Sequence, residues 1–165
     1  SGITGINIFK NKRKYGVIYP LQSINNNITV DFNDIPICIE ANSKNLEKDI
    51  ITLMSRISRN IIVMDSKKRK KLHLAAVIAS NFSNYCYIIA KSILEEEKLD
   101  FNLLHPLIQH TAQKNLNSDP VSNQTGPAKR KDQKTIKEHL NLLSNKNHKK
   151  IYKLLSKSII KEYEK

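Results

Sequence analysis

Residues 66–97 read SKKRKKLHLAAVIASNFSNYCYIIAKSILEEE, and this stretch decides the fold. It contains neither Gly nor Pro, the two residues that most disfavour a helix interior. Its apolar residues recur at helical spacing along one line, with a second line beside the first. The first line comprises Leu72, Ala76, Ala79, Phe82, Cys86, Ile89 and Ile93, and the second comprises Leu74, Ile78 and Tyr85. We therefore expect one long, largely buried helix.

The residues before this helix, 1–64, predict a short α/β edge. Residues 16–19, stopped by Pro20, form a short apolar run, and residues 35–39 and 61–64 form two more that are rich in β-branched side chains. These runs predict three strands. Between the second and third strands, Asn42 or Ser43 can cap a helix whose apolar residues follow helical spacing. A strand, helix, strand order of this length is what the crossover of a parallel sheet requires.

The residues after the long helix predict a helical array. We expect a turn or short helix at 100–104, a helix opened by Pro106 and ending near residue 116, and a loop at 117–127. Two further helices follow, at about 132–144 and 148–164. The fold class is therefore mainly α: a short α/β edge in a first domain, 1–64, and a helical domain built on one long central helix, 65–165.

Composition describes an ordinary globular protein. The 165 residues are 39% hydrophobic and 26% charged. Cys38 and Cys86 show no C-x-x-C spacing, which favours packed free thiols. We find no apolar run that looks long enough to cross a bilayer and no signal peptide, so we expect a soluble, cytoplasmic protein with no membrane partner. The chain begins with Ser1 and not Met; we expect a fragment whose upstream residues hold part of the function.

The net charge of +13 has two interpretations. Basic residues cluster at 10–14, 67–71 and 129–131, and such clusters can form a surface that binds a polyanion. Their lack of interleaved aromatic residues or Gly instead favours solvated lysines, so we expect no nucleic-acid partner. The run at 67–71 also begins the long helix, where exposed N–H groups can attract an anion such as a cofactor phosphate.

A polar interruption in the long helix supplies candidate catalytic residues. At roughly 100° per residue, His73, Ser80 and Asn84 fall within roughly 20° of one line, with Asn81 on its flank. Together they can face one cleft, where a His transfers protons near neutral pH and amides orient a carbonyl or carboxylate. The alternative is a set of hydrogen bonds between helices inside the bundle.

Two loops supply candidate substrate contacts. Tyr19 and Gln22 stand at the carboxyl end of a predicted strand, where ligands collect in open α/β sheets; the alternative is a strand end packed on the helical domain. In the second loop, Gly126 precedes a Pro, which suggests a defined turn beside Thr125 and the cationic Arg130. The alternative there is an ordinary interhelical loop with a solvated basic end.

Metal and nucleotide motifs are absent from the sequence. His105 and His110 are five residues apart, a poor match for one helical face, and no carboxylate completes a set, so we expect no metal site. Neither G-x-G-x-x-G nor a Walker-type loop occurs. We therefore do not expect the chain to bind a dinucleotide by itself.

Three motifs together resemble a known family. They are YGVIYPLQ at 15–22, DSKKRKKLHLAAVIASNFSN at 65–84 and QTGPAKRKD at 124–132. In this order and spacing they resemble proteins that join a Rossmann-like domain to the C-terminal domain of unknown function 2520. That family is similar to the pyrroline-5-carboxylate reductase and 6-phosphogluconate dehydrogenase superfamily. Its members commonly have Gly where this chain has Lys131.

The resemblance implies a fold and a function. Residues 1–64 would end a Rossmann-like sheet, and the rest would resemble the C-terminal domain of 6-phosphogluconate dehydrogenase. An N-terminal domain outside this chain would bind NADP or NAD, and the helical domain would form a homodimer and close the substrate cleft. The implied reaction is hydride transfer to a small carbonyl or imine substrate, with no activity unless the N-terminal domain is present. The alternative is a basic helical module that binds nucleic acid or an acidic protein partner.

Overall fold

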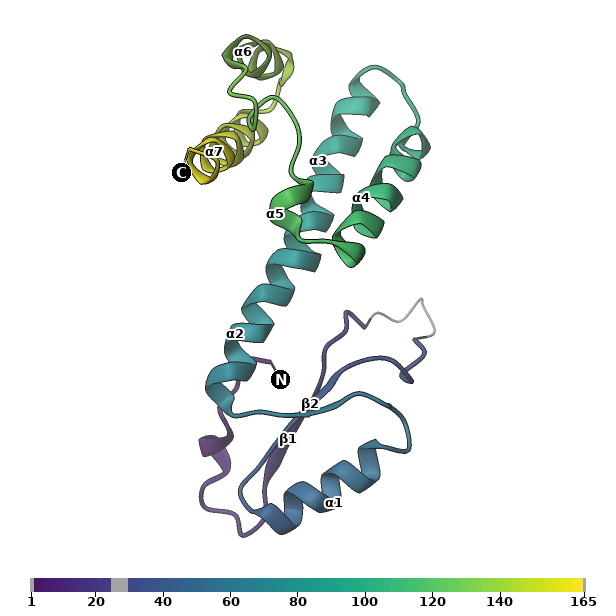
Figure 1. The fold of residues 1–165 in the computed structure, drawn as a ribbon, viewed down its shortest axis with the longest axis vertical. Coiled ribbons are helices and arrows are strands. Elements are labelled where there is room, and N and C mark those ends of the chain that lie inside the picture. The colour runs from purple at the N-terminus through teal and green to yellow at the C-terminus, as the bar shows by residue number, and fades with distance from the viewer. Residues whose placement is uncertain (1, 25–29, 165) are drawn as a thin grey trace. The chain divides into compact units, whose positions relative to one another are not determined.

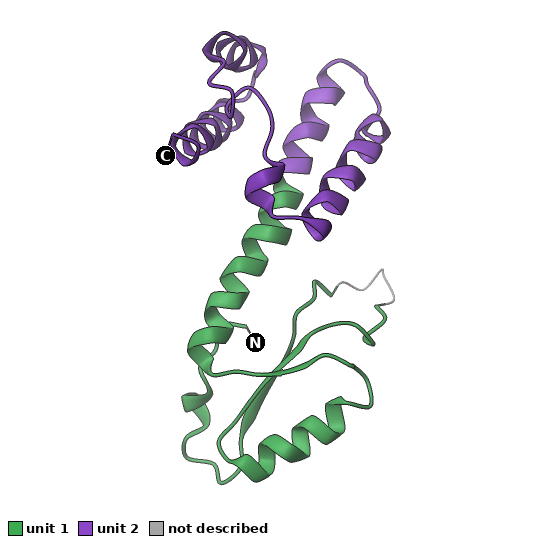
Figure 2. Cartoon of the chain, viewed as in Figure 1, with its two compact units in different colours: residues 1–85 green, residues 86–165 purple. Residues whose placement is uncertain are grey.

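The structure is a computed structural model that describes residues 2–24 and 30–164. Contacts divide the chain into two compact units, Ser1–Tyr85 and Cys86–Lys165 (Figure 2). The division falls inside the long helix, and the expected domain boundary after residue 64 remains a prediction. Each unit is described below by itself.

Unit 1 contains a three-stranded sheet in the order β1-β2-β3 (Figure 1). Strand β1 (Gly16–Pro20) runs antiparallel to β2 (Ile37–Ala41), with Tyr19 opposite Cys38. Strand β3 (Ile61–Val63) runs parallel to β2. The predicted crossover is confirmed, because helix α1 (Lys44–Met54) connects the two parallel strands. Strand β2 begins at residue 37 and not 35, since Pro36 has no N–H to donate to a ladder.

The core of unit 1 forms where α1 packs on the central strand. Ile37 and Ile39 of β2 are fully buried and contact the buried Ile50 of α1. Ser43 caps helix α1, because its side chain accepts a hydrogen bond from the N–H of Leu46 at 3.4 Å. The central position of β2, with a strand on each side, explains why three consecutive residues of this strand are buried.

The predicted long helix is confirmed, but its predicted burial is wrong. It comprises α2 (Ser66–Ala76), a π-helical turn η2 (Val77–Phe82) and α3 (Ser83–Glu96). Large apolar side chains along it are exposed: Leu74, Ile78, Phe82, Tyr85, Tyr87, Ile88 and Ile93. Periodicity identifies the apolar faces of a helix but does not say what covers them, and the described residues of this chain leave these side chains open.

The expectation that no segment could span a bilayer is also wrong by length and composition. The continuous helix Ser66–Glu96 is long and apolar enough for a membrane span, and the most apolar stretch of this helix is not buried within the chain. A helix that packs its apolar face on another protein surface meets the same criteria.

Unit 2 is helical. It contains η3 (Phe101–Leu104), α4 (His105–Asn117), α5 (Pro120–Asn123), α6 (Gln133–Leu142) and α7 (Lys146–Glu162). The short α5 lies in the segment predicted as a loop. It forms because Asp119 accepts a hydrogen bond from the N–H of Val121, and Pro120 is tolerated in a first turn. Cys86 is exposed, whereas Cys38 is buried, so packing is confirmed for Cys38 alone.

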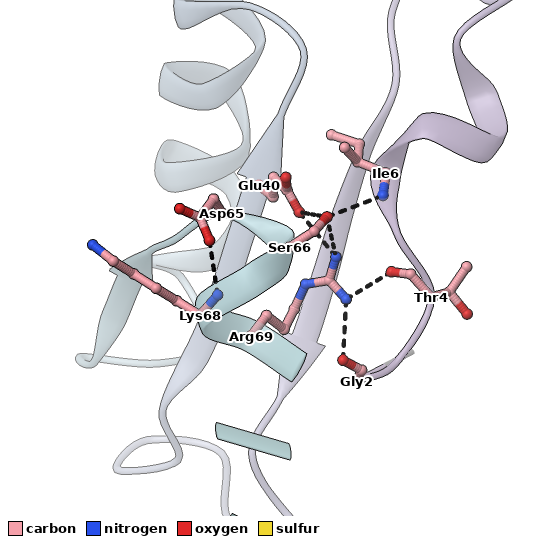
Figure 3. A network of polar contacts seen from close by, with 8 residues as sticks. All are labelled: Gly2, Thr4, Ile6, Glu40, Asp65, Ser66, Lys68 and Arg69. Carbon is pink, nitrogen blue, oxygen red and sulfur yellow. Dashed lines mark hydrogen bonds and ion pairs between the residues drawn. The ribbon is translucent and has the colours of Figure 1, made fainter. Parts of the chain in front are cut away.

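A buried guanidinium holds the N-terminal segment to the rest of unit 1. Arg69 of α2 is fully buried and forms an ion pair with Glu40 of β2, Nη2 to Oε2, at 2.9 Å. Its Nη1 donates to the backbone carbonyls of Gly2 at 3.3 Å and Thr4 at 2.9 Å (Figure 3). Ser66 Oγ accepts from Arg69 and donates to Glu40. The N-terminal segment, β2 and α2 thus share one polar network.

A pair of isoleucines tests this account of the core. Ile39→Ala should lower the free energy of unfolding by about 2–5 kcal/mol, because it leaves a cavity at a fully buried position. Its cross-strand partner Ile18 is 39% exposed, so Ile18→Ala should cost less than about 1 kcal/mol. Urea unfolding of both variants checks the difference. Equal losses would contradict a core centred on β2.

Candidate functional site

Unit 1 contains a pocket between the end of β1 and the long helix, with a volume of about 410 Å³. Leu21 and Ser23 line it from the loop after β1, and Ala76, Val77 and Ala79 line it from the helix. Five residues predicted from the sequence as site residues also line it: Tyr19, Gln22, His73, Ser80 and Asn81. Two of the sequence-based candidate groups, the strand end and the polar line of the helix, therefore meet in one pocket.

Tyr19 and His73 form a hydrogen-bonded pair in this pocket. The phenol oxygen lies 3.0 Å from His73 Nδ1, and the rings meet edge to face with centroids 5.9 Å apart. Burial raises the pKa of Tyr19, as does nearby Cys38, while Arg69 opposes the shift. The phenol therefore keeps its proton and can donate it to Nδ1. When the phenol donates in this way, Nδ1 accepts and the hydrogen of the ring lies on Nε2.

The part of the long helix that lines the pocket includes the π-helical turn η2. An α-helix bonds each N–H four residues back, but a π-helix reaches five residues back and so accommodates one extra residue. Because of this extra residue, every later side chain points in a direction rotated by roughly 100° about the helix axis, compared with a regular α-helix. Asn81 lines the pocket, whereas Asn84, placed on the same line as His73 by regular spacing, does not. A catalytic role for Asn84 remains a prediction.

Ser80 and Asn81 are exposed, and their side chains make no hydrogen bond to any other residue in 2–24 and 30–164. The alternative interpretation, hydrogen bonds between helices, is thus not observed for these two side chains in the described part of the chain. A pocket with apolar walls and a few convergent polar groups is the usual form of a small-molecule site. This one offers hydroxyl, amide and imidazole groups to a ligand.

The second predicted loop forms its turn in unit 2, outside this pocket. Gly126 has φ +102°, so the predicted defined turn is confirmed. Thr125 lines a different pocket, of about 280 Å³, beside α4 and α5. Gly126 and Arg130 line neither pocket. Substrate contacts by Thr125, Gly126 and Arg130 remain predictions.

The end of this loop holds a strained residue. Lys131 has φ +56°, in the left-handed region that Gly occupies most readily. This is the position at which the family resemblance predicts Gly. The next residue, Asp132, begins α6 by accepting hydrogen bonds from the backbone and side chain of Thr135. The backbone hydrogen bond, with the side-chain bond second, lowers the pKa of Asp132 and keeps this carboxylate charged.

Arg69 is the residue that the sequence analysis missed. It lies in the basic run at 67–71, a pattern that predicts a solvated surface or an anion site, yet its side chain is fully buried. A signal was present in the sequence: Arg69 is the single Arg in this run and precedes His73 by four residues, which places both on one helix face.

Gly126 provides a test of the loop. Gly126→Ala should lower the free energy of unfolding by about 1–2 kcal/mol, since a side chain is disfavoured at positive φ. The added methyl group would meet no atom within 4 Å, so crowding cannot explain a loss. Gly5→Ala is the control, because Gly5 has φ −72° and ordinary contact distance to its nearest neighbour. Thermal unfolding that is unchanged in Gly126→Ala would refute the strained turn.

The solved structures that resemble the chain include these two. A protein from Bacteroides fragilis described as "putative NADP oxidoreductase" superposes with a TM-score of 0.94 at 37% identity, over 98% of this chain and 63% of the other. A Thermotoga maritima protein superposes with a TM-score of 0.78 at 27% identity, over 99% of this chain and 67% of the other. The chain thus spans 63% of the length of the first protein. No curated protein matches significantly.

A family model matches residues 35–159, from the central strand of the sheet into the last helix. This range includes the long helix with His73, Ser80 and Asn81, and the loop with Gly126. It also covers most of the chain. The chain therefore belongs to the family described as domain of unknown function (DUF2520).

Proposed function

We propose that this chain is the substrate-cleft part of an NADP- or NAD-dependent oxidoreductase that transfers hydride to a small carbonyl or imine. The observation that carries the proposal is the pocket where Tyr19, His73, Ser80 and Asn81 converge. The likeness to the Bacteroides fragilis protein supports an oxidoreductase-related domain and favours NADP as the cofactor.

The residues of the pocket suit the substrate half of this chemistry. Hydride addition to a carbonyl or imine leaves a negative charge on the oxygen or nitrogen, which needs a proton donor. His73 can pass its Nε2 proton to that atom while its Nδ1 takes up the phenol proton of Tyr19, which leaves a neutral imidazole and a tyrosinate. Ser80 and Asn81 can donate hydrogen bonds that orient the substrate. Leu21 and Val77 place apolar walls beside these polar groups.

The dinucleotide, when bound, supplies the hydride. The pocket volume of about 410 Å³ suits a small substrate, and the sequence has no G-x-G-x-x-G loop to hold a pyrophosphate. We therefore assign the binding of the dinucleotide mainly to residues outside this chain. On this proposal the protein is soluble and cytoplasmic, and its natural partner is a small molecule.

Variants of the pocket in the full-length protein test the proposal. His73→Gln should lower kcat/KM for NADPH-dependent reduction by about 100-fold or more, the usual contribution of a positioned proton donor. Asn81→Ala should lower it by about 10-fold, since it removes a substrate-orienting hydrogen bond. Asn84→Ala tests the catalytic role predicted from regular helical spacing: a loss like that of Asn81→Ala would support this role, whereas wild-type turnover would limit the site to the side chains that line the pocket. Full activity in His73→Gln would exclude the proposed proton donor.

A homodimer is part of the same proposal. Exposed apolar side chains such as Leu74, Ile78 and Phe82 on the long helix provide a surface that a second copy can cover. Sedimentation of the full-length protein should give twice the monomer mass, and Phe82→Glu should shift the equilibrium towards monomer because it would bury a charge. A monomer at all accessible concentrations would contradict this part of the proposal.

A further inference from the structure

The fully buried Arg69 connects the N-terminal segment to the helix that carries His73. Its Nη1 donates to the carbonyl oxygens of Gly2 and Thr4, and its Nη2 bonds Glu40 and Ser66. Ser66 Oγ also accepts from the N–H of Ile6 at 3.1 Å. Figure 3 shows the guanidinium between the segment on one side and Glu40 and Ser66 on the other. This geometry fixes the position of the backbone at Gly2.

Gly2 in turn lies close to the imidazole of His73. A Cβ atom built on Gly2 would lie 2.5 Å from Cγ and 2.9 Å from Cβ of His73, closer than real side chains approach. The backbone of Gly2 therefore lies directly against the imidazole, nearest to Nδ1 and Cγ. The same Nδ1 atom lies 3.0 Å from the phenol oxygen of Tyr19. A backbone that Arg69 anchors and a phenol at the end of β1 thus both contact this part of the ring.

From these contacts we propose that Arg69 is a positioning residue for His73. It anchors Gly2, and Gly2 confines the imidazole to the orientation in which Nδ1 accepts from Tyr19 and Nε2 carries the hydrogen. This inference rests on the proposed function only for its consequence in catalysis. The orientation and tautomer of His73 are properties of the folded protein that can be measured without a substrate.

Nitrogen NMR of the full-length protein provides the test. The ring ¹⁵N shifts of His73 report which nitrogen carries the hydrogen, and Tyr19→Phe gives the reference for a ring that has lost its hydrogen bond. Arg69→Lys keeps the positive charge but cannot bridge two carbonyls and a carboxylate at once. Gly2→Ala leaves Arg69 intact and crowds the ring directly. We expect both variants to shift the His73 signals towards those of Tyr19→Phe.

Two internal comparisons separate this effect from general damage. His139 forms a similar pair in unit 2, with Nδ1 2.7 Å from the phenol oxygen of Tyr152, and its signals should not change. Lys68→Met alters the neighbouring residue of the same basic run, whose side chain is exposed, and should leave His73 unchanged. Wild-type shifts for His73 in folded Arg69→Lys would overturn the proposal. If that variant does not fold, wild-type shifts in Gly2→Ala would overturn it.

Turnover of the same variants distinguishes this inference from the proposed function. A loss of kcat with altered His73 signals supports both. Altered signals with wild-type turnover leave Arg69 as the positioning residue but exclude His73 as the proton donor. Wild-type signals with lost turnover exclude the positioning role alone.

Discussion

A guanidinium without access to water is a costly group, because removing a single ion from solvent costs several kcal/mol before any partner is found. Arg69 offsets this cost with a carboxylate, a hydroxyl and two backbone carbonyls. These partners come from the N-terminal segment, strand β2 and helix α2, three parts of the chain far apart in sequence. If any one of these segments moves away, Arg69 keeps fewer hydrogen bonds while it stays buried. This cost favours the one arrangement in which all three segments contact the guanidinium.

The candidate pocket depends on this arrangement from two directions. Antiparallel pairing with β2 places Tyr19 opposite the buried Cys38, so the phenol is presented from the end of a paired strand. The helix that Arg69 anchors presents His73 one turn later. Burial raises the pKa of the Cys38 thiol, with Arg69 opposing the shift, so this residue stays neutral behind the tyrosine.

Much of the fold could be predicted from the sequence, since its signals are local. The β-branched runs gave the strands, and the absence of Gly and Pro from 66–97 gave the long helix. The covering of that helix could not be predicted, because periodicity carries no information about what packs on Phe82 or Ile78. The small α5 was missed although Asp119 and Pro120 are a capping pattern. Arg69 was missed because a basic run suggests solvation, and only the tertiary structure shows a carboxylate and carbonyls around one member.

For the candidate site, the types of residue could be predicted more reliably than the directions in which their side chains point around the helix. Ser80 and Asn81 could be identified because they are polar residues in an apolar helix. The directions of their side chains could not, because the value of roughly 100° per residue holds only for an unbroken α-helix. The π-helical turn has a consequence for any comparison of this helix with a regular one. Val77–Phe82 holds one more residue than the same length of α-helix. An alignment of the two helices therefore needs a one-residue gap in this turn to pair side chains that point the same way; without the gap, Asn84 would be paired with a side chain on the line of His73.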